Sequence, residues 1–476
     1  MRPTIEEVVR TETRIKPKSK LIFTLCVLWL LVIVSPAAAE RPNILFILAD
    51  DMGWGDASCY GNAQFKTPNI DRLAAQGVRF EQAYQAASVC SPSRAALLSG
   101  RFPAELKFHR ALGSHAENEK FGTVDSLDPK STCVLPQILK QAGYSTAHVG
   151  KWHLGDLLSR DPAAYGFDIA RWVDYRSGSR NLGKLPERPD CSKILVDETI
   201  SILDQIGNEP FYCQLWLLDP HAPLMPTQDQ MAPFRKEEPE GFTSPDMVYA
   251  AAVTEMDRQI GRLLEYLDKR GIAENTIVVF SSDNGPEDGH AMNARWSASG
   301  SSGPFRGRKR SLYDGGTRLP FLFRWPGGGV PAGMVNKKSV ISGLDLMPTL
   351  CELTGLEVPE ADRKILDGES VAAAVKGDTN FQRKRPLFWE RRFEVLGEEN
   401  CSPRLAVRKG KWKLLLNTED DRTELYDMEQ DAREGANVAA GNPEIVETLR
   451  RELVGWKQSL PSGPVDPRAG RRYGDY

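Results

Sequence analysis

The chain has 476 residues, of which 41% are hydrophobic and 26% charged, and its 61 basic and 64 acidic residues leave a net charge of −3. This composition is typical of a globular protein, and it excludes both a disordered chain and a small disulfide-stapled scaffold. A near-neutral balance also argues against a nucleic-acid-binding protein, which would usually carry a basic excess. We therefore expect no nucleic-acid partner.

The first 39 residues have the order of a secretory signal peptide. Basic residues between positions 14 and 20 precede an apolar run at 21–34, and three alanines at 37–39 end the segment. The run is shorter than the roughly 20 residues that a membrane span needs. We predict cleavage after Ala39 and a secreted or periplasmic mature chain. An uncleaved N-terminal anchor is the alternative.

Seven cysteines follow the signal segment, and none of them forms a CxxC pair. A zinc site is therefore not expected. Because seven is an odd number, at least one cysteine stays unpaired in an oxidising compartment, and the spacing leaves open which of the others pair.

Short apolar runs alternate with helical patterns along the first two thirds of the chain. Four runs predict buried parallel strands, at 43–48, 146–149, 211–218 and 276–281. Three segments predict helices, at 70–76, 135–142 and 249–267. Strands that alternate with helices indicate an α/β sheet.

Polar side chains follow each of the four predicted strands. They are Asp50 and Asp51 after the first, Lys151 and His153 after the second, His221 after the third, and Asp283 and Asn284 after the fourth. In open α/β sheets the ligand crevice lies at the carboxyl ends of the strands. The four runs therefore predict one site.

Four of these residues offer hard oxygen ligands: Asp50, Asp51, Asp283 and Asn284. Three carboxylates gathered in one crevice would repel one another strongly without a cation. Ligands that are all oxygen favour Ca²⁺ or Mg²⁺ over zinc. The sequence therefore predicts a metal site at the strand ends.

The C-terminal part has a different pattern. A β-hairpin is predicted from 405–408 and 411–416, a further strand at 424–426 and an amphipathic helix at 443–460. We place a catalytic α/β domain at 40–384 and a small α+β subdomain at 385–476. Within the former, the stretch 330–380 is expected to be mixed loop and helix.

The sharpest motif is Cys90-Ser91-Pro92-Ser93-Arg94, which continues through Leu98, Gly100 and Arg101. It resembles the sulfatase signature C-x-P-S-R-x-x-x-L-x-G-R. Four further blocks, at 43–54, 150–155, 282–285 and 305–320, also resemble blocks of that family. The resemblance covers roughly 41–440, and its details are similar to the N-acetylgalactosamine-6-sulfatase and arylsulfatase A branch.

This resemblance implies an alkaline-phosphatase-like, mostly parallel sheet flanked by helices. It also implies that Cys90 is oxidised to formylglycine by a formylglycine-generating enzyme, that the metal is Ca²⁺ and that the substrate is a sulfated saccharide. The implied metal ligands are Asp50, Asp51, residue 90, Asp283 and Asn284. The implied catalytic residues are Cys90, Arg94, Lys151, His153, His221 and Lys309.

The family mechanism gives each of these residues a role. One hydroxyl of the hydrated formylglycine attacks sulfur while Lys151 and Lys309 hold sulfate oxygens. His221 or Lys309 protonates the leaving alcohol, and His153 deprotonates the second hydroxyl so that sulfate is expelled. A helix that starts near Ser93 would add an anion-binding N-terminus. Lys309 is chosen from a basic run because it matches the family's lysine before a Gly-Gly pair.

The segment 106–128 follows the signature and is polar. His109, Arg110 or His115 could reach a sugar, but a solvated loop is the favoured interpretation.

Two other functions are weighed against a sulfatase. A phosphatase or phosphonate hydrolase of the same superfamily often binds two zinc ions, and the histidine pair of that second site is missing after Asp283. An inactive protein that binds sulfated glycans would lose the nucleophile or a metal ligand, and all of these are present. The sequence does not identify the substrate, because specificity lies in loops that vary between relatives.

Overall fold

The four runs predicted as strands lie next to one another in the middle of a nine-stranded sheet. The strand order is β5 (Gly178–Arg180), β4 (Ile169–Asp174), β3 (Ser145–Lys151), β6 (Phe211–Trp216), β1 (Asn43–Ala49), β7 (Thr276–Ser282), β8 (Phe321–Arg324), β2 (Val78–Tyr84) and β9 (Met334–Ser342). From β4 to β7 all neighbours are parallel, whereas β5 and β8 run antiparallel to theirs. The mostly parallel sheet confirms the predicted fold class.

The computed structural model describes residues 41–155, 161–174, 178–180, 188–236, 244–290, 296–420 and 422–474. The predicted signal peptide at 1–39 lies outside these residues. The chain from Pro42 onward packs as one compact unit. No helix among the described residues is long and apolar enough to cross a membrane.

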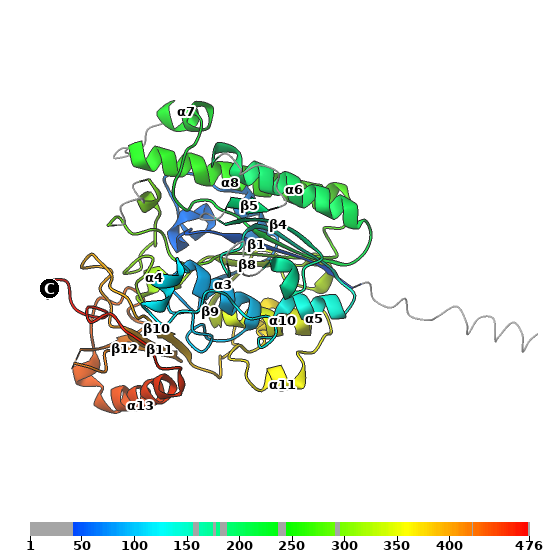
Figure 1. The fold of residues 1–476 in the computed structure, drawn as a ribbon. Helices are drawn as coiled ribbons and strands as arrows, with labels where there is room; N and C mark the ends of the chain where they lie inside the picture. Colours follow the sequence, from blue (N-terminus) through cyan, green and yellow to red (C-terminus); the bar gives the residue numbers. More distant parts are fainter. Residues whose placement is uncertain are drawn as a thin grey trace, which may run out of the picture. The chain divides into compact units, whose positions relative to one another are not determined.

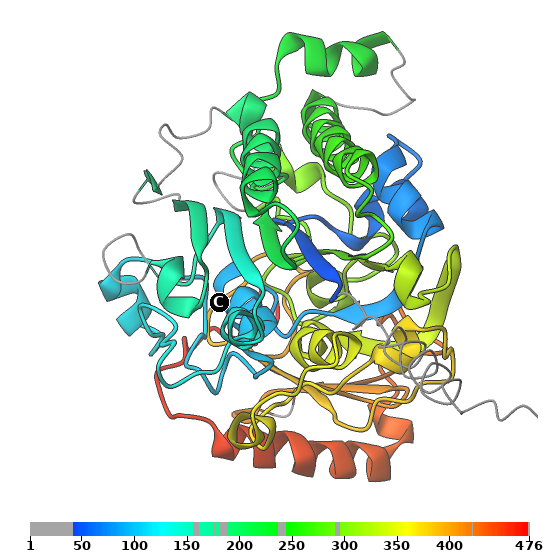
Figure 2. The ribbon, with the colours of Figure 1, turned by 90° about the vertical axis from the view of Figure 1, so that its right-hand side faces the viewer.

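Helices cover both faces of the large sheet. Ile44, Phe46 and Leu48 of β1 face a core shared with α3 (Cys90–Ser99), α5 (Leu135–Gln141) and α10 (Leu346–Leu353). Leu45 and Ile47 face the opposite core, shared with α2 (Pro68–Ala75), α6 (Cys191–Ile206) and α8 (Ser244–Lys269). Figures 1 and 2 show α6 and α8 along one side of the sheet and α5 and α10 along the other. Burial on both faces explains why these strands read as continuous apolar runs.

The three predicted helices are confirmed as α2, α5 and α8, with ends that differ from the prediction by a few residues. The other described α-helices before residue 385 are short: α4 (His115–Glu119), α7 (Gln228–Lys236), α9 (Asp314–Thr317), α11 (Glu360–Arg363) and α12 (Ala372–Val375).

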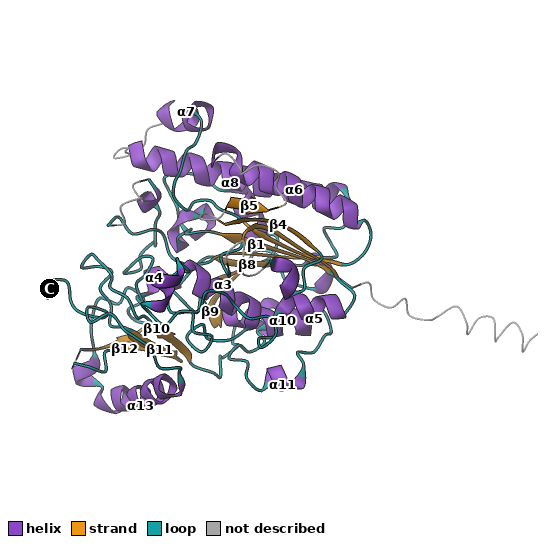
Figure 3. Cartoon of the chain, in the orientation of Figure 1, coloured by secondary structure: helices purple, strands orange, loops and turns teal. Residues whose placement is uncertain are grey.

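A second, antiparallel sheet lies in the C-terminal part (Figure 3). Its strands are β10 (Leu387–Glu390), β11 (Leu405–Lys409), β12 (Trp412–Leu416) and β13 (Thr423–Asp427), and α13 (Pro443–Ser459) packs against it. The hairpin, the added strand and the helix are as predicted. The second sheet begins at Leu387, close to the predicted subdomain boundary at residue 385. The division of the chain into two subdomains stays a prediction.

The prediction of mixed loop and helix at 330–380 is wrong for its first part. Met334–Ser342 forms β9, an edge strand parallel to β2. Lys337 and Lys338 lie exposed in the middle of this strand, so it carries no apolar run. An edge strand with charged residues needs none, because only part of it is covered.

No disulfide bond joins any two of the seven cysteines among the described residues. This agrees with the expectation that at least one would be unpaired.

Candidate active site

The carboxyl ends of β3, β6, β1 and β7 meet at one edge of the sheet, and the predicted site residues gather there. Asp50 and Asp51 follow β1, Asp283 and Asn284 follow β7, and Lys151 is the last residue of β3. All five side chains are buried. Parallel neighbouring strands therefore bring together residues as far apart in the sequence as Asp50 and Asn284.

Two lysines bind the two adjacent aspartates. Lys151 Nζ lies 2.6 Å from Asp50 Oδ2, and Lys309 Nζ lies 2.5 Å from Asp51 Oδ2. Burial alone would raise the pKa of Asp50, but nearby cations, chiefly Lys151, hold it below its usual value. Burial would lower the pKa of both lysines, yet the carboxylates raise it above its usual value. Both lysines therefore remain charged.

The negative charge of Asp51 is less well stabilised than that of Asp50. Burial and the neighbouring carboxylates raise the pKa of Asp51 to about 7, even though Lys309 acts to lower it. The other oxygen of Asp51, Oδ1, accepts a hydrogen bond from Asn284 Nδ2 at 2.7 Å. Burial is thus the main reason why the charged form of Asp51 is disfavoured.

Arg94 holds the third aspartate. Its Nε and Nη2 donate to Asp283 Oδ2 at 3.0 and 2.7 Å, and its Nη1 donates to the carbonyl of Lys151 at 3.1 Å. The guanidinium also lies 4.9 Å from the ring centroid of Trp216. Arg94 thus connects α3 to the ends of β3 and β7.

Cys90 lies at the centre of this group. It is the first residue of α3, so the helix starts three residues earlier than the predicted start near Ser93. Its Sγ is 3.7 Å from Asp50 Oδ1, and one ligand atom from each of Asp50, Asp51, Cys90 and His221 fits within 4.8 Å. Burial raises the pKa of the Cys90 thiol to about 12.

The two predicted proton-transfer histidines take different places. His221 Nε2 lies 3.7 Å from Asp51 Oδ2, and its Nδ1 lies 2.7 Å from the carbonyl of Ala222. Since a carbonyl can only accept, Nδ1 carries the proton and Nε2 faces the carboxylates. Burial lowers the pKa of His221 well below its usual value. His153 Nε2 lies 3.2 Å from the carbonyl of Leu112, and the N–H of Leu112 donates to Ser91 Oγ on α3.

Glu287 and Arg310 belong to this network and were missed in the sequence. Glu287 Oε2 lies 3.1 Å from Lys309 Nζ, and Glu287 also pairs with Arg310. Burial would raise the pKa of Glu287, but the two cations hold it well below its usual value. The acidic pair Glu287-Asp288, just after the block at 282–285, is the pattern that could have indicated it.

The backbone is unusual at several site residues. Asp51, His153 and Arg310 have φ values of 68°, 59° and 76°, a region that non-glycine residues seldom adopt. Gly150 has a φ of 107°, and a Cβ there would lie 1.9 Å from the carbonyl oxygen of Trp216. Strain of this kind persists where the surrounding structure fixes the chain, and it is concentrated at functional sites.

The residues present fit a hard cation. The donor set consists of carboxylate and amide oxygens, which suit Ca²⁺ or Mg²⁺. Asn284 Oδ1 is buried and has no hydrogen-bond partner among the described residues. A cation shared by Asp50, Asp51, Asp283 and Asn284 would use that oxygen and favour the charged form of Asp51, which burial and the neighbouring carboxylates disfavour.

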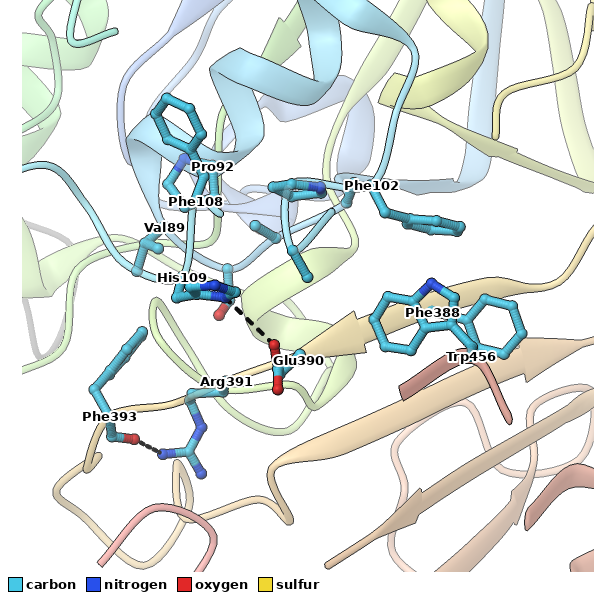
Figure 4. A pocket seen from close by; sticks show the side chains of 15 residues that line it. Val89, Pro92, Phe102, Phe108, His109, Phe388, Glu390, Arg391, Phe393 and Trp456 are labelled. Carbon is cyan, nitrogen blue, oxygen red and sulfur yellow. Dashed lines mark hydrogen bonds and ion pairs between the residues drawn. The ribbon is translucent and has the colours of Figure 1, made fainter. Parts of the chain in front are cut away.

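The segment 106–128 is only partly the solvated loop that the sequence favours. It contains α4, and His109 is buried in a small cavity between the start of α3 and the second sheet (Figure 4). His109 Nδ1 lies 3.3 Å from Glu390 Oε2. His115, by contrast, is exposed and pairs with Asp125. The apolar lining of the cavity, including Phe108, draws this part of the segment inward.

Two family models match the chain. The model described as Sulfatase matches residues 42–356, and the model described as N-sulphoglucosamine sulphohydrolase, C-terminal, matches residues 303–459.

Curated relatives and solved structures extend these matches. The chain is 34% identical over 402 residues to N-acetylgalactosamine-6-sulfatase of Canis lupus familiaris, covering 76% of this chain and 72% of that protein. It is 30% identical to Arylsulfatase A of Homo sapiens, covering 87% of each. The crystal structure of Ps i-CgsB in complex with k-i-k-neocarrahexaose matches with a TM-score of 0.77 and 28% identity, covering 90% of this chain and 96% of that chain.

Proposed function

This chain belongs to the sulfatase family, and from that premise we propose that it hydrolyses sulfate esters of a sulfated carbohydrate through a formylglycine and a Ca²⁺ site. The observation that carries the proposal is the position of Cys90, at the start of α3 and within the buried group of Asp50, Asp51 and His221. The relatives named N-acetylgalactosamine-6-sulfatase and the match to a neocarrahexaose complex support a saccharide substrate.

The unmodified thiol is poorly suited to the reaction. With a pKa of about 12, Cys90 stays protonated at neutral pH, whereas the thiolate is the nucleophilic form. This supports conversion of residue 90 to formylglycine by a formylglycine-generating enzyme. The hydrated aldehyde would supply one hydroxyl as nucleophile and a second that allows release of sulfate.

Three positive features converge on residue 90. Lys151 and Lys309 are buried cations that contact the aspartates beside it. Residue 90 also opens the ten-residue helix α3, whose first N–H groups and dipole favour an anion. We assign the two lysines to the sulfate oxygens, where they would stabilise charge that develops in the transition state.

Ca²⁺ fits the cluster of Asp50, Asp51, Asp283 and Asn284, together with an oxygen on residue 90. Bound there, it would neutralise the carboxylates and favour the ionised form of a hydroxyl. Arg94 keeps Asp283 in place through two hydrogen bonds to one oxygen, which leaves Oδ1 to accept from the backbone N–H of Asp51 at 3.1 Å.

His221 and His153 are the proposed proton carriers. The Nδ1–H of His221 donates to Ala222, so its Nε2 is the atom that exchanges a proton at the site. Either His221 or Lys309 protonates the leaving alcohol, and His153 serves the release of sulfate. We further propose that the mature protein is secreted or periplasmic, which the signal-like segment at 1–39 supports.

A desulfation screen with mass analysis of position 90 tests the proposal. Sulfated mono- and oligosaccharides and an aryl sulfate are assayed beside matching phosphate and phosphonate esters. We expect sulfate release and a peptide at residue 90 about 18 Da lighter than its cysteine form, because CH₂SH becomes CHO. Preferred cleavage of phosphate or phosphonate esters, or an active preparation that carries only unmodified cysteine, would contradict it.

A further inference from the structure

A second feature, outside the candidate active site, is a strongly basic groove between the two sheets. It has a volume of about 730 Å³ and lies among the edge strand β9, the segment at 380–385 and the β11–β12 turn. Eight of its lining residues are lysine or arginine, and only Glu429 is acidic. The whole chain has a net charge of −3, so this groove is a local excess of positive charge.

Some of these cations are neutralised by carboxylates. Arg318 pairs with Asp314, Lys409 with Glu452 and Lys411 with Asp427. These pairs fix parts of the walls and leave little charge for a ligand.

Four other cations lack such partners. Among the described residues, no carboxylate lies within ion-pair distance of Lys337, Lys338, Arg385 or Arg408. Lys337 and Lys338 are exposed next to each other on β9, where the pairing with β2 is irregular. Arg385 is exposed and donates to the carbonyls of Leu366 and Gly368.

Arg408 is the most informative of the four, because it is 2% exposed. It donates to the carbonyl of Gly410 and to Gln82 Oε1, but its Nε has no hydrogen-bond partner. Nearby, Nε and Nη2 of Arg383 are also buried and unpartnered, although its Nη1 lies 2.5 Å from Asp345. The N–H groups of a buried guanidinium are normally hydrogen-bonded. The unpartnered N–H groups on this wall could therefore donate to an anion.

The two walls are held at a fixed separation. Gln82 Nε2 donates to the carbonyl of Lys337 at 2.8 Å, while Gln82 Oε1 accepts from Arg408 Nη2 at 3.1 Å. One side chain therefore joins β9 to β11. Phe381 and Val340 add apolar surface to the same groove.

We propose that this groove is a second binding site, for a sulfated polysaccharide chain, which holds the polymer while one of its sulfate groups reaches residue 90. A groove of one charge sign attracts a polyanion and raises its local concentration. Arg318 in the groove is nine residues from Lys309 in the active site, which sets an upper limit of roughly 30 Å between them. The identity of the polymer as a sulfated glycan rests on the proposed function.

The test measures binding of fluorescent dextran sulfate, with uncharged dextran as the reference, by fluorescence anisotropy. Lys337→Glu/Lys338→Glu is the groove variant. Lys66→Glu/Lys130→Glu is the matched control, because both lysines are exposed, lie outside the groove and give the same charge change. We expect the groove variant to bind dextran sulfate at least about tenfold more weakly, with a shallower salt dependence, and the control to bind like the wild type.

Three results would overturn the proposal: equal affinity in both variants, binding that is lost on Lys151→Ala but kept in the groove variant, or tighter binding of a DNA duplex than of dextran sulfate. Hydrolysis of 4-nitrophenyl sulfate separates this proposal from the proposed function. None of the residues that line the groove belongs to the candidate active site, so kcat and KM for this small substrate should be unchanged in the groove variant. If the wild type hydrolyses no sulfate ester, the proposed function fails while the binding measurement still tests the groove.

Discussion

Arg94 and Asp283 form a fully buried ion pair in which two guanidinium nitrogens, Nε and Nη2, approach the same carboxylate oxygen at 3.0 and 2.7 Å. The third nitrogen, Nη1, donates to the carbonyl of Lys151. One side chain on α3 therefore sets the orientation of a carboxylate after β7 and of the backbone at the end of β3. A planar guanidinium can make these contacts together, and an ammonium cannot.

We expect Arg94→Lys to lower both activity and stability, although the charge is kept. Breaking a buried ion pair outright typically destabilises a protein by about 3–5 kcal/mol, so Arg94→Ala should lose more than Arg94→Lys. Arg258→Lys is the control, because Arg258 pairs with Glu255 on the surface. Such exposed pairs contribute only about 0–1 kcal/mol. Thermal unfolding and sulfate release are measured, and equal effects at the two positions would contradict the role of Arg94.

Removal of the metal should make stability depend on pH in a specific direction. Asp51 has a pKa of about 7 in the folded, metal-free protein against 3.8 in the unfolded chain, so the folded state binds more protons between these values. The contribution of Asp51 to the stability of the metal-free protein should therefore fall as pH rises from about 4 to 7. Asp51→Asn should flatten this slope. Unfolding curves after chelation, measured across this range, test the sign.

Added Ca²⁺ should reverse this trend. Metal binding requires ionised carboxylates, so affinity should rise with pH and the bound protein should gain stability in proportion to ligand saturation. Chelation should abolish activity and Ca²⁺ should restore it. If neither chelator nor Ca²⁺ changes the activity or the unfolding temperature, the metal assignment is wrong.

Cys90→Ser separates the two halves of the proposed cycle. A serine hydroxyl can still attack sulfur beside Lys151 and Lys309, but it has no second hydroxyl to expel sulfate. We expect at most one slow turnover and a sulfo group of about 80 Da left on residue 90, which intact-protein mass spectrometry would detect. Sustained turnover by this variant would instead favour a phosphatase-like mechanism.

Gly150→Ala should displace Lys151 by disturbing the end of β3. The new Cβ would lie 1.9 Å from the carbonyl oxygen of Trp216, and φ is 107°. Gly410→Ala is the control for backbone strain alone, since φ there is 54° and no atom lies within 4 Å of the added Cβ. We expect about 1–3 kcal/mol of destabilisation in the control and clearly more at Gly150, measured by denaturant unfolding. Equal losses would mean that β3 adjusts without moving Lys151.

The sequence alone determined the centre of the fold and the composition of the candidate site. The four central strands are buried on both faces, so each can be predicted from its own apolar run, and three helices can be predicted from their residue patterns. The signature around Cys90 predicted the family, and the match over 42–356 confirms it. Asp50, Asp51, Asp283 and Asn284 were found because each directly follows a predicted strand.

Only the tertiary structure decided which polar residues of the loops face the site. In the basic run at 306–310, Lys309 reaches Asp51 while Arg308 donates to the carbonyls of Glu287 and Ala298. The sequence pattern does not distinguish them, because side-chain direction in an irregular loop follows its local φ and ψ and has no period. The lysine was chosen from the family resemblance.

The same reason explains what the sequence missed. Glu287 becomes a site residue only because the chain after β7 folds back on Lys309, and His109 is buried only because the second sheet covers it. The edge strand β9, with its exposed lysines, has no apolar run to reveal it. The pattern of apolar residues within a helix or strand indicates which of its faces is buried. The contacts of loops and edge strands depend on residues far away in the sequence, so a short stretch of sequence does not predict them.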